Sequence, residues 1–464
     1  MPIDWIDRLI DDVPPMERYY RVAELDARAD DLAAAYPEAV RVERIGTSRA
    51  GHPIRMMTIG DGPIPALLFG CPHPNEPIGA QMLDHLARVL AQDADLRERL
   101  PFTWYLIPCV DPDGTKLNEG WFDDPGSLLN YARHFYRPPS QEQVEWTFPF
   151  AYRGHEWTTP LPETAAVAQA IRSLRPRFVY SLHNCGFGGV YYYLSRPMPD
   201  LHPVLRSLAV THGLPLALGE PEVQWAKRYD DAILGSLSQA DHIDHVVAHG
   251  GDEAAAKLVR GGGSSYDFAV GIVPDVGHLL CEVPYFLVEG IADGRPSGQL
   301  RRDAFLASLE KSEEFSSALD LWLTLLDGTL KVASSFRSAV TETRQWLPAS
   351  IELLQHMIDT DPEMQREATV AERANALYVD GGYRLLSLSM VPRMVAAERA
   401  GRSVSSDEEE RLRQVETEAT AMIDCWHADL DAGAHYQAVP IQTLVRIELA
   451  AGLRMAEYLA GELR

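Results

Sequence analysis

A histidine and a glutamate lie three residues apart at the end of an apolar run. They are His73 and Glu76, in the stretch GCPHPNEPIGAQML at residues 70–83, between the run IPALLFG and a pattern of helical spacing. Zinc accepts imidazole nitrogen and carboxylate oxygen, and a catalytic zinc site typically has three protein ligands and a fourth position for water. The pair can therefore supply two ligands. Two such residues also occur together by chance, as a surface histidine and a glutamate that begins a helix.

Candidates for a third ligand and for a proton-transferring carboxylate lie in two later apolar runs. His183 ends the strand pattern RFVYSLHN, where it either completes the ligand set or is a hydrogen-bonded core residue. Glu282 lies within HLLCEVPYF, at residues 278–286. An unpaired carboxylate in such a strand is costly unless it faces a cleft, has a partner or is protonated. Because burial raises a carboxyl pKa, Glu282 is the candidate that takes a proton from activated water and gives it to a leaving nitrogen.

The elements that must position these side chains alternate between strands and helices. Helical spacing at about residues 15–37 is followed by the runs VRVERIG and IRMMTIG, whose linking turn predicts a hairpin. A succession of strand, helix and strand then indicates the crossover unit of a parallel or mixed sheet. Its segments are strand 64–71, helix 77–92, strand 102–110, helix 162–175 and strands 177–184, 191–194 and 278–286. Residues 111–160 lack clean periodicity, which predicts long loops of the kind that build a site.

Beyond about residue 300 nearly the whole chain has helical periodicity. Apolar residues share helical faces, for example Ile441, Leu444 and Val445. We therefore predict two domains, an α/β catalytic domain at residues 1–298 and an all-α helical domain at 299–464. The apolar faces of the helical region fit the core of a bundle, packed either on the catalytic domain or on a second copy of the chain in a homo-oligomer.

Composition excludes several classes of partner. The 464 residues include 42 Lys and Arg against 67 Asp and Glu, so the net charge is −25. Nucleic acid and anionic membranes need a positive field and are not expected as partners. We see no secretory signal at the N-terminus and no run of about 18 apolar residues for a membrane span. The five cysteines include no CxxC pair, which favours reduced thiols in a cytoplasmic protein.

The chain resembles the zinc carboxypeptidase family, the metallocarboxypeptidases of the funnelin type, over about residues 15–295. The similarity starts with the spacing of His73, Glu76, His183 and Glu282. Five further segments follow in the family's order. They are YPEAVRVERIGTSRAGHPIRMMTIG, DPDG at 111–114, LPETAAVAQAI, SLHN and GGGSSYDF.

This resemblance implies a fold, a cofactor and a mechanism. The fold is a mixed sheet of the eight-stranded type flanked by helices. Zn²⁺ is expected on His73, Glu76 and His183, with Glu282 as general base and then general acid, and with an arginine sharing the charge of the oxyanion. Water attacks the amide directly, without a covalent intermediate, and the chain has no GxSxG motif for a serine nucleophile.

The expected substrate contacts depart from the family pattern. An Asn-Arg pair usually holds the terminal carboxylate, and the matching stretch here has Ala132 and Arg133. Arg133 fits the pattern, but Ala132 replaces the Asn. Half of the carboxylate clamp is therefore missing. Arg137 is a second candidate for substrate binding, although stacking on loop aromatics explains it equally well. Tyr266 falls near the specificity position and is expected to contribute an aromatic pocket floor.

Three functions remain open from the sequence. The first is a metallocarboxypeptidase-type peptidase that releases a C-terminal residue from a small peptide. The second is a zinc amidase or deacylase that acts on a small N-acyl or peptidyl metabolite, which the incomplete clamp favours. The third is a non-enzymatic binding module on the same fold, with the helical region used for assembly. Retention of all four residues of the metal centre argues against the third.

Overall fold

The computed structural model describes residues 5–462. Its centre is a mixed sheet of nine strands among these residues, in the order β1-β2-β4-β3-β7-β12-β9-β11-β10. The predicted α/β architecture is confirmed, with one strand more than the resemblance implies. The strands are β1 (Val40–Thr47), β2 (Pro53–Ile59), β3 (Ile64–Phe69), β4 (Phe102–Ile107), β7 (Phe178–Ser181), β9 (Tyr191–Leu194), β10 (Arg228–Asp230), β11 (Ile233–Gly235) and β12 (Gly277–Glu282).

The middle of the sheet is parallel. β7 pairs in parallel with β3 on one side and with β12 on the other. The carboxyl ends of these three neighbours therefore lie along one edge of the sheet. His73 and Glu76 follow β3, His183 follows β7, and Glu282 is the last residue of β12. Convergence of the four predicted residues is thus a consequence of strand order.

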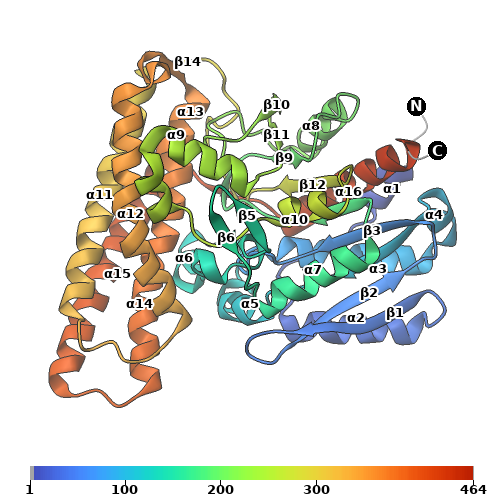
Figure 1. Cartoon of the computed structure of the whole chain (residues 1–464), viewed down its shortest axis with the longest axis horizontal. Coiled ribbons are helices and arrows are strands. Elements are labelled where there is room, and N and C mark those ends of the chain that lie inside the picture. The colour runs from blue at the N-terminus through green and yellow to red at the C-terminus, as the bar shows by residue number, and fades with distance from the viewer. Residues whose placement is uncertain (1–4, 463–464) are drawn as a thin grey trace.

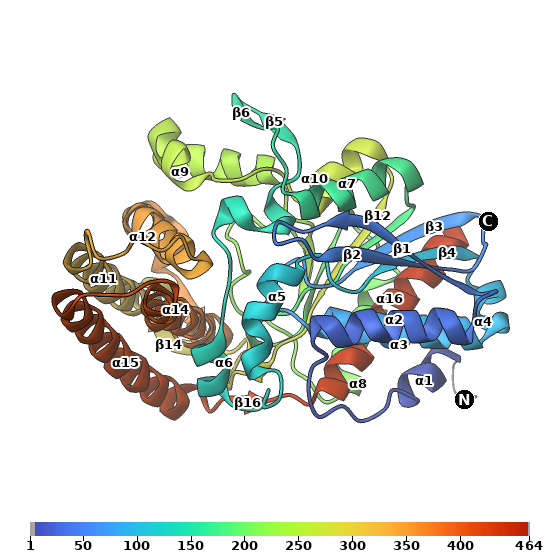
Figure 2. The ribbon, with the colours of Figure 1, turned by 90° about the horizontal axis from the view of Figure 1, so that it is seen from below.

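Helices cover both faces of the sheet, because its central strands are apolar on both sides. On one face, α3 (Ile78–Gln92) and α16 (Ile441–Glu462) share a core with Phe178 and Tyr180 of β7. On the other face, α7 (Pro162–Leu174) and α10 (Ser265–Ile272) enclose Val179 of the same strand. The helices α2 (Val22–Ala35) and α8 (His202–Thr211) extend the first layer (Figures 1 and 2).

Residues 111–160 are less irregular than the sequence predicts. They include α5 (Pro112–Asn118), α6 (Leu128–His134) and a small hairpin of β5 (Phe150–Tyr152) and β6 (His155–Trp157). The carboxylate of Asp111 accepts a hydrogen bond from the Gly114 amide, and the Ser127 hydroxyl accepts one from Asn130. Such caps satisfy free amides at helix starts and stabilise short helices that have little periodicity of their own.

Four long helices form a bundle beside the sheet (Figure 1). They are α11 (Arg301–Leu325), α12 (Ser335–Thr360), α14 (Asp380–Gly401) and α15 (Ser406–Ala434), and α9 (Gln239–Leu258) packs against α12. The predicted helical character of the C-terminal region is confirmed. No helix among residues 5–462 carries an apolar stretch long enough to cross a membrane.

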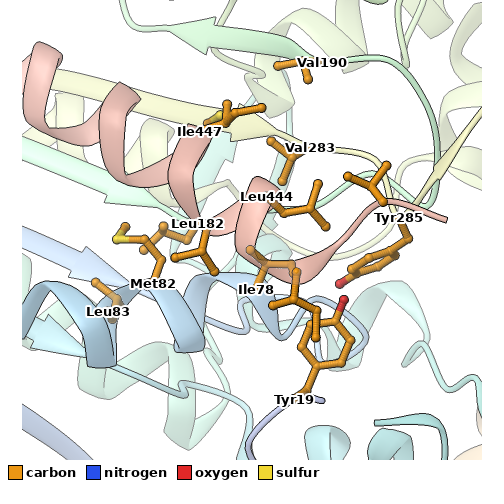
Figure 3. Packing of buried hydrophobic residues seen from close by; sticks show 14 of the residues in the cluster. Tyr19, Ile78, Met82, Leu83, Leu182, Val190, Val283, Tyr285, Leu444 and Ile447 are labelled. Atoms are coloured by element: carbon orange, nitrogen blue, oxygen red, sulfur yellow. The ribbon is translucent and has the colours of Figure 1, made fainter. Parts of the chain in front are cut away.

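The last helix, α16, leaves the bundle and returns to the sheet. Its Leu444 and Ile447 belong to one continuous core with Ile78 and Met82 of α3, and Leu444 lies beside Ile78 (Figure 3). Residues 299–462 therefore supply both a bundle and a layer of the α/β core. The boundary at residue 298 between two domains stays a prediction.

Candidate active site

Three side chains at the carboxyl edge of the sheet form a group that can hold a metal ion. One ligand atom from each of His73, Glu76 and His183 lies within 4.8 Å of the other two, and all three residues are buried. The backbone brings the first two together: Cys71 takes a positive φ of 53° after β3, and the Glu76 amide donates to the His73 carbonyl in the next turn. Two imidazoles and a carboxylate are a suitable set for zinc.

The hydrogen bonds of this group leave room for an ion. The Nδ1 atom of His73 is buried and has no hydrogen-bond partner, whereas buried polar atoms are normally satisfied. Burial, reinforced by Arg137 and His183, lowers the pKa of His73 well below its usual value. His73 is therefore neutral, which is the form that binds metals. Nδ1 of His183 lies 3.2 Å from Oε2 of Glu76. The residues present thus fit a zinc ion.

His183 is held from behind by polar groups that the sequence did not single out. Its Nε2 lies 2.9 Å from the Ser181 hydroxyl and 3.9 Å from a carboxylate oxygen of Glu145. Glu145 is itself anchored by the amide and hydroxyl of Ser265, at 2.9 and 2.7 Å. A partner on the far nitrogen orients a ligating imidazole, so Nδ1 of His183 is left to face Glu76.

Arg137 contacts the other side of Glu76. Its Nη1 donates to Oε1 of Glu76 at 2.8 Å and to Oδ1 of Asn75 at 3.2 Å, while Nε donates to Gln143 at 3.3 Å. Among residues 5–462 no hydrogen bond engages Nη2 of Arg137, so one edge of the guanidinium is free to donate.

Glu282 lies beside the group without belonging to it. Its Oε1 is 3.9 Å from Nδ1 of His183, and its side chain lines the cavity. Burial, followed by the carboxylates of Glu222 and Glu76, raises the pKa of Glu282 well above its usual value. A carboxyl group with a raised pKa beside a metal site is suited to accept and return a proton near neutral pH.

The cavity over these residues has a volume of about 380 Å³. Its floor is the carboxyl edge of the sheet, and one wall comes from the helical bundle. Residues of this wall are Ala339, Glu342, Thr343 and Trp346 of α12 and Tyr383, Ser387 and Met390 of α14. The helical region therefore limits the size of a bound substrate.

The three predicted substrate residues have different positions. Arg137 and Tyr266 line the cavity, but Arg133 does not. Arg133 lies on α6, which buries Tyr131 and Ala132. Its guanidinium is half exposed and donates to Asp424 of α15 at 3.1 Å. The structure thus gives no support to a substrate contact by Arg133, because the phase of the helix turns it away from the cavity.

A buried glutamate of the last helix also reaches the ligand set. Glu448 of α16 is fully buried, and its Oε1 accepts a hydrogen bond from the side-chain amide of Asn184 at 3.1 Å. The backbone amide of Asn184 donates to Oε2 of Glu76 at 3.3 Å. Burial raises the pKa of Glu448 well above its usual value. Glu448 therefore supports the loop that carries His183 and steadies Glu76.

We expect replacement of Glu448 by leucine to weaken zinc binding by about 10-fold to 100-fold, the usual range for groups that support metal ligands. Leucine removes the acceptor of the Asn184 amide, so the loop that contacts Glu76 loses a fixed position. The measurement is the zinc dissociation constant by competition with a chelator. Glu448→Gln is the matched control, because its carbonyl still accepts from Asn184. Equal zinc affinity in the leucine variant and the wild type would contradict this role.

The fold and the site together define a metal-dependent hydrolase: a mixed sheet with three metal-ligating side chains and one further carboxylate at its carboxyl edge. The chain belongs to the zinc carboxypeptidase family, whose sequence model matches residues 25–271.

Solved structures with a related fold are distant in sequence. Carboxypeptidase A from Helicoverpa armigera is 16% identical, with 58% of this chain and 65% of that chain covered and a TM-score of 0.38. A metallo-carboxypeptidase from Pseudomonas aeruginosa is 17% identical, with 57% and 60% covered and a TM-score of 0.32. Murein-tripeptide amidase from Escherichia coli O157 is also 17% identical, with 58% and 89% covered and a TM-score of 0.27. The alignment spans less than two thirds of the Helicoverpa and Pseudomonas chains.

Proposed function

We propose that this protein is a zinc-dependent hydrolase that cleaves an amide bond in a small substrate. The observation that carries the proposal is the convergence of His73, Glu76 and His183 to within 4.8 Å, with the Glu282 carboxylate beside them in the same cavity. A binding module would have no physical need for a buried, unpaired acid next to a ligand set, which favours the enzyme over the non-enzymatic alternative.

The side chains of the cavity have complementary parts in this reaction. His73, Glu76 and His183 would hold the zinc ion, which when bound would supply an activated water molecule and polarise the scissile carbonyl. Glu282 accepts the proton of the attacking water and then delivers it to the leaving amine. The free edge of Arg137 donates to the oxygen that gains negative charge. No side chain forms a covalent bond to the substrate.

The charges of the cavity favour an amidase over a carboxypeptidase. A carboxypeptidase needs a cation that binds the substrate's terminal carboxylate, and the lining carries a single arginine, Arg137, which is already bonded to Glu76. The same lining carries five glutamates, namely Glu76, Glu145, Glu222, Glu282 and Glu342. Among the lining residues, a terminal carboxylate would therefore find no cation besides Arg137 to bind it. The proposed substrate is therefore a small N-acyl or peptidyl amide whose cleavage does not depend on a free carboxylate.

Matched chromogenic peptides that differ only in a free or amidated C-terminus test this proposal. We expect zinc-dependent cleavage of the amidated peptide with a kcat/KM at least equal to that of the free acid, because the cavity lining has no second cation that binds the carboxylate. A loss of about 100-fold or more on amidation, the scale of a missing charge-assisted contact, would instead establish a carboxypeptidase. If the zinc-loaded protein cleaves neither peptide, across a range of side chains, that result contradicts both the amidase and the carboxypeptidase function.

A cytoplasmic location is a separate proposal. All five cysteines are unpaired in the structure, and three of them, Cys71, Cys185 and Cys281, are buried. Free thiols are typical of a reducing compartment. Assembly into a homo-oligomer through the helical region stays a prediction from the sequence.

A further inference from the structure

We propose that the substrate carries a cationic group, an ammonium or guanidinium, which binds to Glu222 beside the ring of Tyr191. This inference rests on the proposed amide hydrolysis and names the chemistry of the substrate. It concerns Glu222, Tyr191 and Tyr193, to which the sequence assigns no role. Of these, the mechanism uses Glu222 only through its effect on the pKa of Glu282.

Glu222 lies close to the reacting groups. It comes from the loop between α8 and β10, and its Oε2 accepts hydrogen bonds from the hydroxyls of Tyr191 and Tyr193, both at 3.3 Å. Tyr191 is the direct partner of Glu282 in the pairing of β9 with β12. Residues that pair directly, and residues two apart in a strand, point to the same face of a sheet. Both tyrosines and Glu282 therefore face the same side, and Glu222 lies over them.

The carboxylate of Glu222 is available to a ligand. The residue is exposed to the cavity, and among residues 5–462 no basic side chain forms an ion pair with it. Burial raises the pKa of Glu222, and the charges of Arg137 and His183, at a greater distance, partly offset this rise. The two tyrosines occupy Oε2 and leave Oε1 without a donor. Arg228 lines the adjoining hollow, but no ion pair joins it to Glu222. Arg137 is held by Glu76 and Asn75 instead.

The other glutamates of the lining already have hydrogen-bond partners or a role in the metal site. Glu145 is bonded to Ser265, Glu342 accepts from the amide of Ser140 at 2.7 Å, and Glu76 belongs to the ligand set. Among residues 5–462, Glu222 is thus the lining carboxylate that neither pairs directly with a protein cation nor transfers a proton in the proposed reaction.

An unpaired carboxylate beside an aromatic ring is the chemistry that recognises a cation. The ring centroids of Tyr191 and Tyr193 are 5.7 Å apart, and the two rings pack edge to face. Aromatic faces attract ammonium and guanidinium groups, and a charge-assisted hydrogen bond to a carboxylate adds to this attraction. A neutral donor would leave the charge of the Glu222 carboxylate without a counter-charge, and an anion would be repelled by that carboxylate. A cation therefore fits best.

Doubly blocked dipeptides test the proposal on the full-length, zinc-loaded protein. Two series, acetyl-X-Ala-amide and acetyl-Ala-X-amide, place X before or after the scissile bond. X is lysine or its uncharged counterpart norleucine, and arginine or its uncharged counterpart citrulline. In at least one series we expect the cationic member to have a kcat/KM about tenfold or more above that of its neutral counterpart. Glu222→Gln should bring this ratio close to one.

Binding is measured separately, so that it does not depend on turnover. The same dipeptides are titrated by calorimetry into zinc-loaded Glu282→Gln protein, with and without Glu222→Gln. We expect the cationic member to bind about tenfold more tightly than its neutral counterpart, and this difference to vanish when Glu222 is changed. Glu253→Gln, which removes a carboxylate from an exposed position on α9, is the matched control and should keep both ratios.

The outcomes separate the two proposals. Tighter binding of the cationic dipeptides without any hydrolysis supports the cation site and overturns the proposed function. Hydrolysis without preference for either member of each pair overturns the cation site and keeps the proposed function. A preference that survives Glu222→Gln, or a lack of binding by all of the dipeptides, also overturns the assignment of Glu222.

Discussion

Replacement of Glu282 by glutamine is expected to lower kcat by about 10²-fold to 10⁴-fold, the range of general acid and base catalysis, while the protein keeps its zinc. Glutamine has the shape of glutamate but cannot accept a proton from water. The ligand atoms of His73, Glu76 and His183 lie together without Glu282. Rates on an amide substrate and the zinc content by elemental analysis are measured on the same preparation.

The two readouts decide between alternative roles for Glu282. Loss of zinc together with activity would place Glu282 in the ligand set instead. Activity close to that of the wild type would show that another group transfers the proton. Glu289→Gln is a suitable control, because it removes the same charge from an exposed position seven residues further along the chain. It should keep both the zinc and the rate.

The convergence of the metal site could be predicted from the sequence because two local signals combine in it. Apolar runs mark buried strands, and polar residues at their carboxyl ends meet where parallel neighbours share an edge. His73, Glu76, His183 and Glu282 all satisfy both conditions, since β3, β7 and β12 are adjacent and parallel. For these residues, a pattern within each segment was enough to place the side chain.

Other residues of the site depend on tertiary packing that no segment encodes by itself. Helical periodicity predicts a helix around Glu448, but not that this helix leaves the bundle to pack beside α3. Glu222 lies in a loop and Glu145 in a 3-10 turn at Val144–Trp146, and both are positioned by distant hydroxyls. Arg133 shows the converse, since a motif match within a segment does not give the phase of the short helix that carries it.

The helical region restricts the size of the substrate that the site can accept. Its α12 and α14 close one side of a cavity of about 380 Å³, and ligand pockets of small molecules are of this size. The geometry therefore agrees with a small amide substrate, and the negative lining directs the choice further toward a cationic one.

Replacement of His73 by alanine is expected to remove the zinc, because two protein ligands remain where a catalytic site typically uses three. In the wild type His73 Nδ1 is buried without a hydrogen-bond partner, so alanine breaks no internal hydrogen bond of that atom and the fold should persist. We expect the zinc content to fall from about one ion per chain toward zero after dialysis, and kcat/KM to fall by about 10³-fold or more as water activation is lost.

Thermal unfolding gives this prediction a readout that is independent of activity. A ligand present at about 1,000 times its dissociation constant stabilises the native state by about 4 kcal/mol, so added zinc should raise the Tm of the chelator-treated wild type. The His73→Ala variant should show no such rise at the same zinc concentration. His249→Ala, which changes an exposed histidine of α9, should respond as the wild type does. A zinc-dependent rise of equal size in His73→Ala would mean that the ion binds elsewhere in the chain.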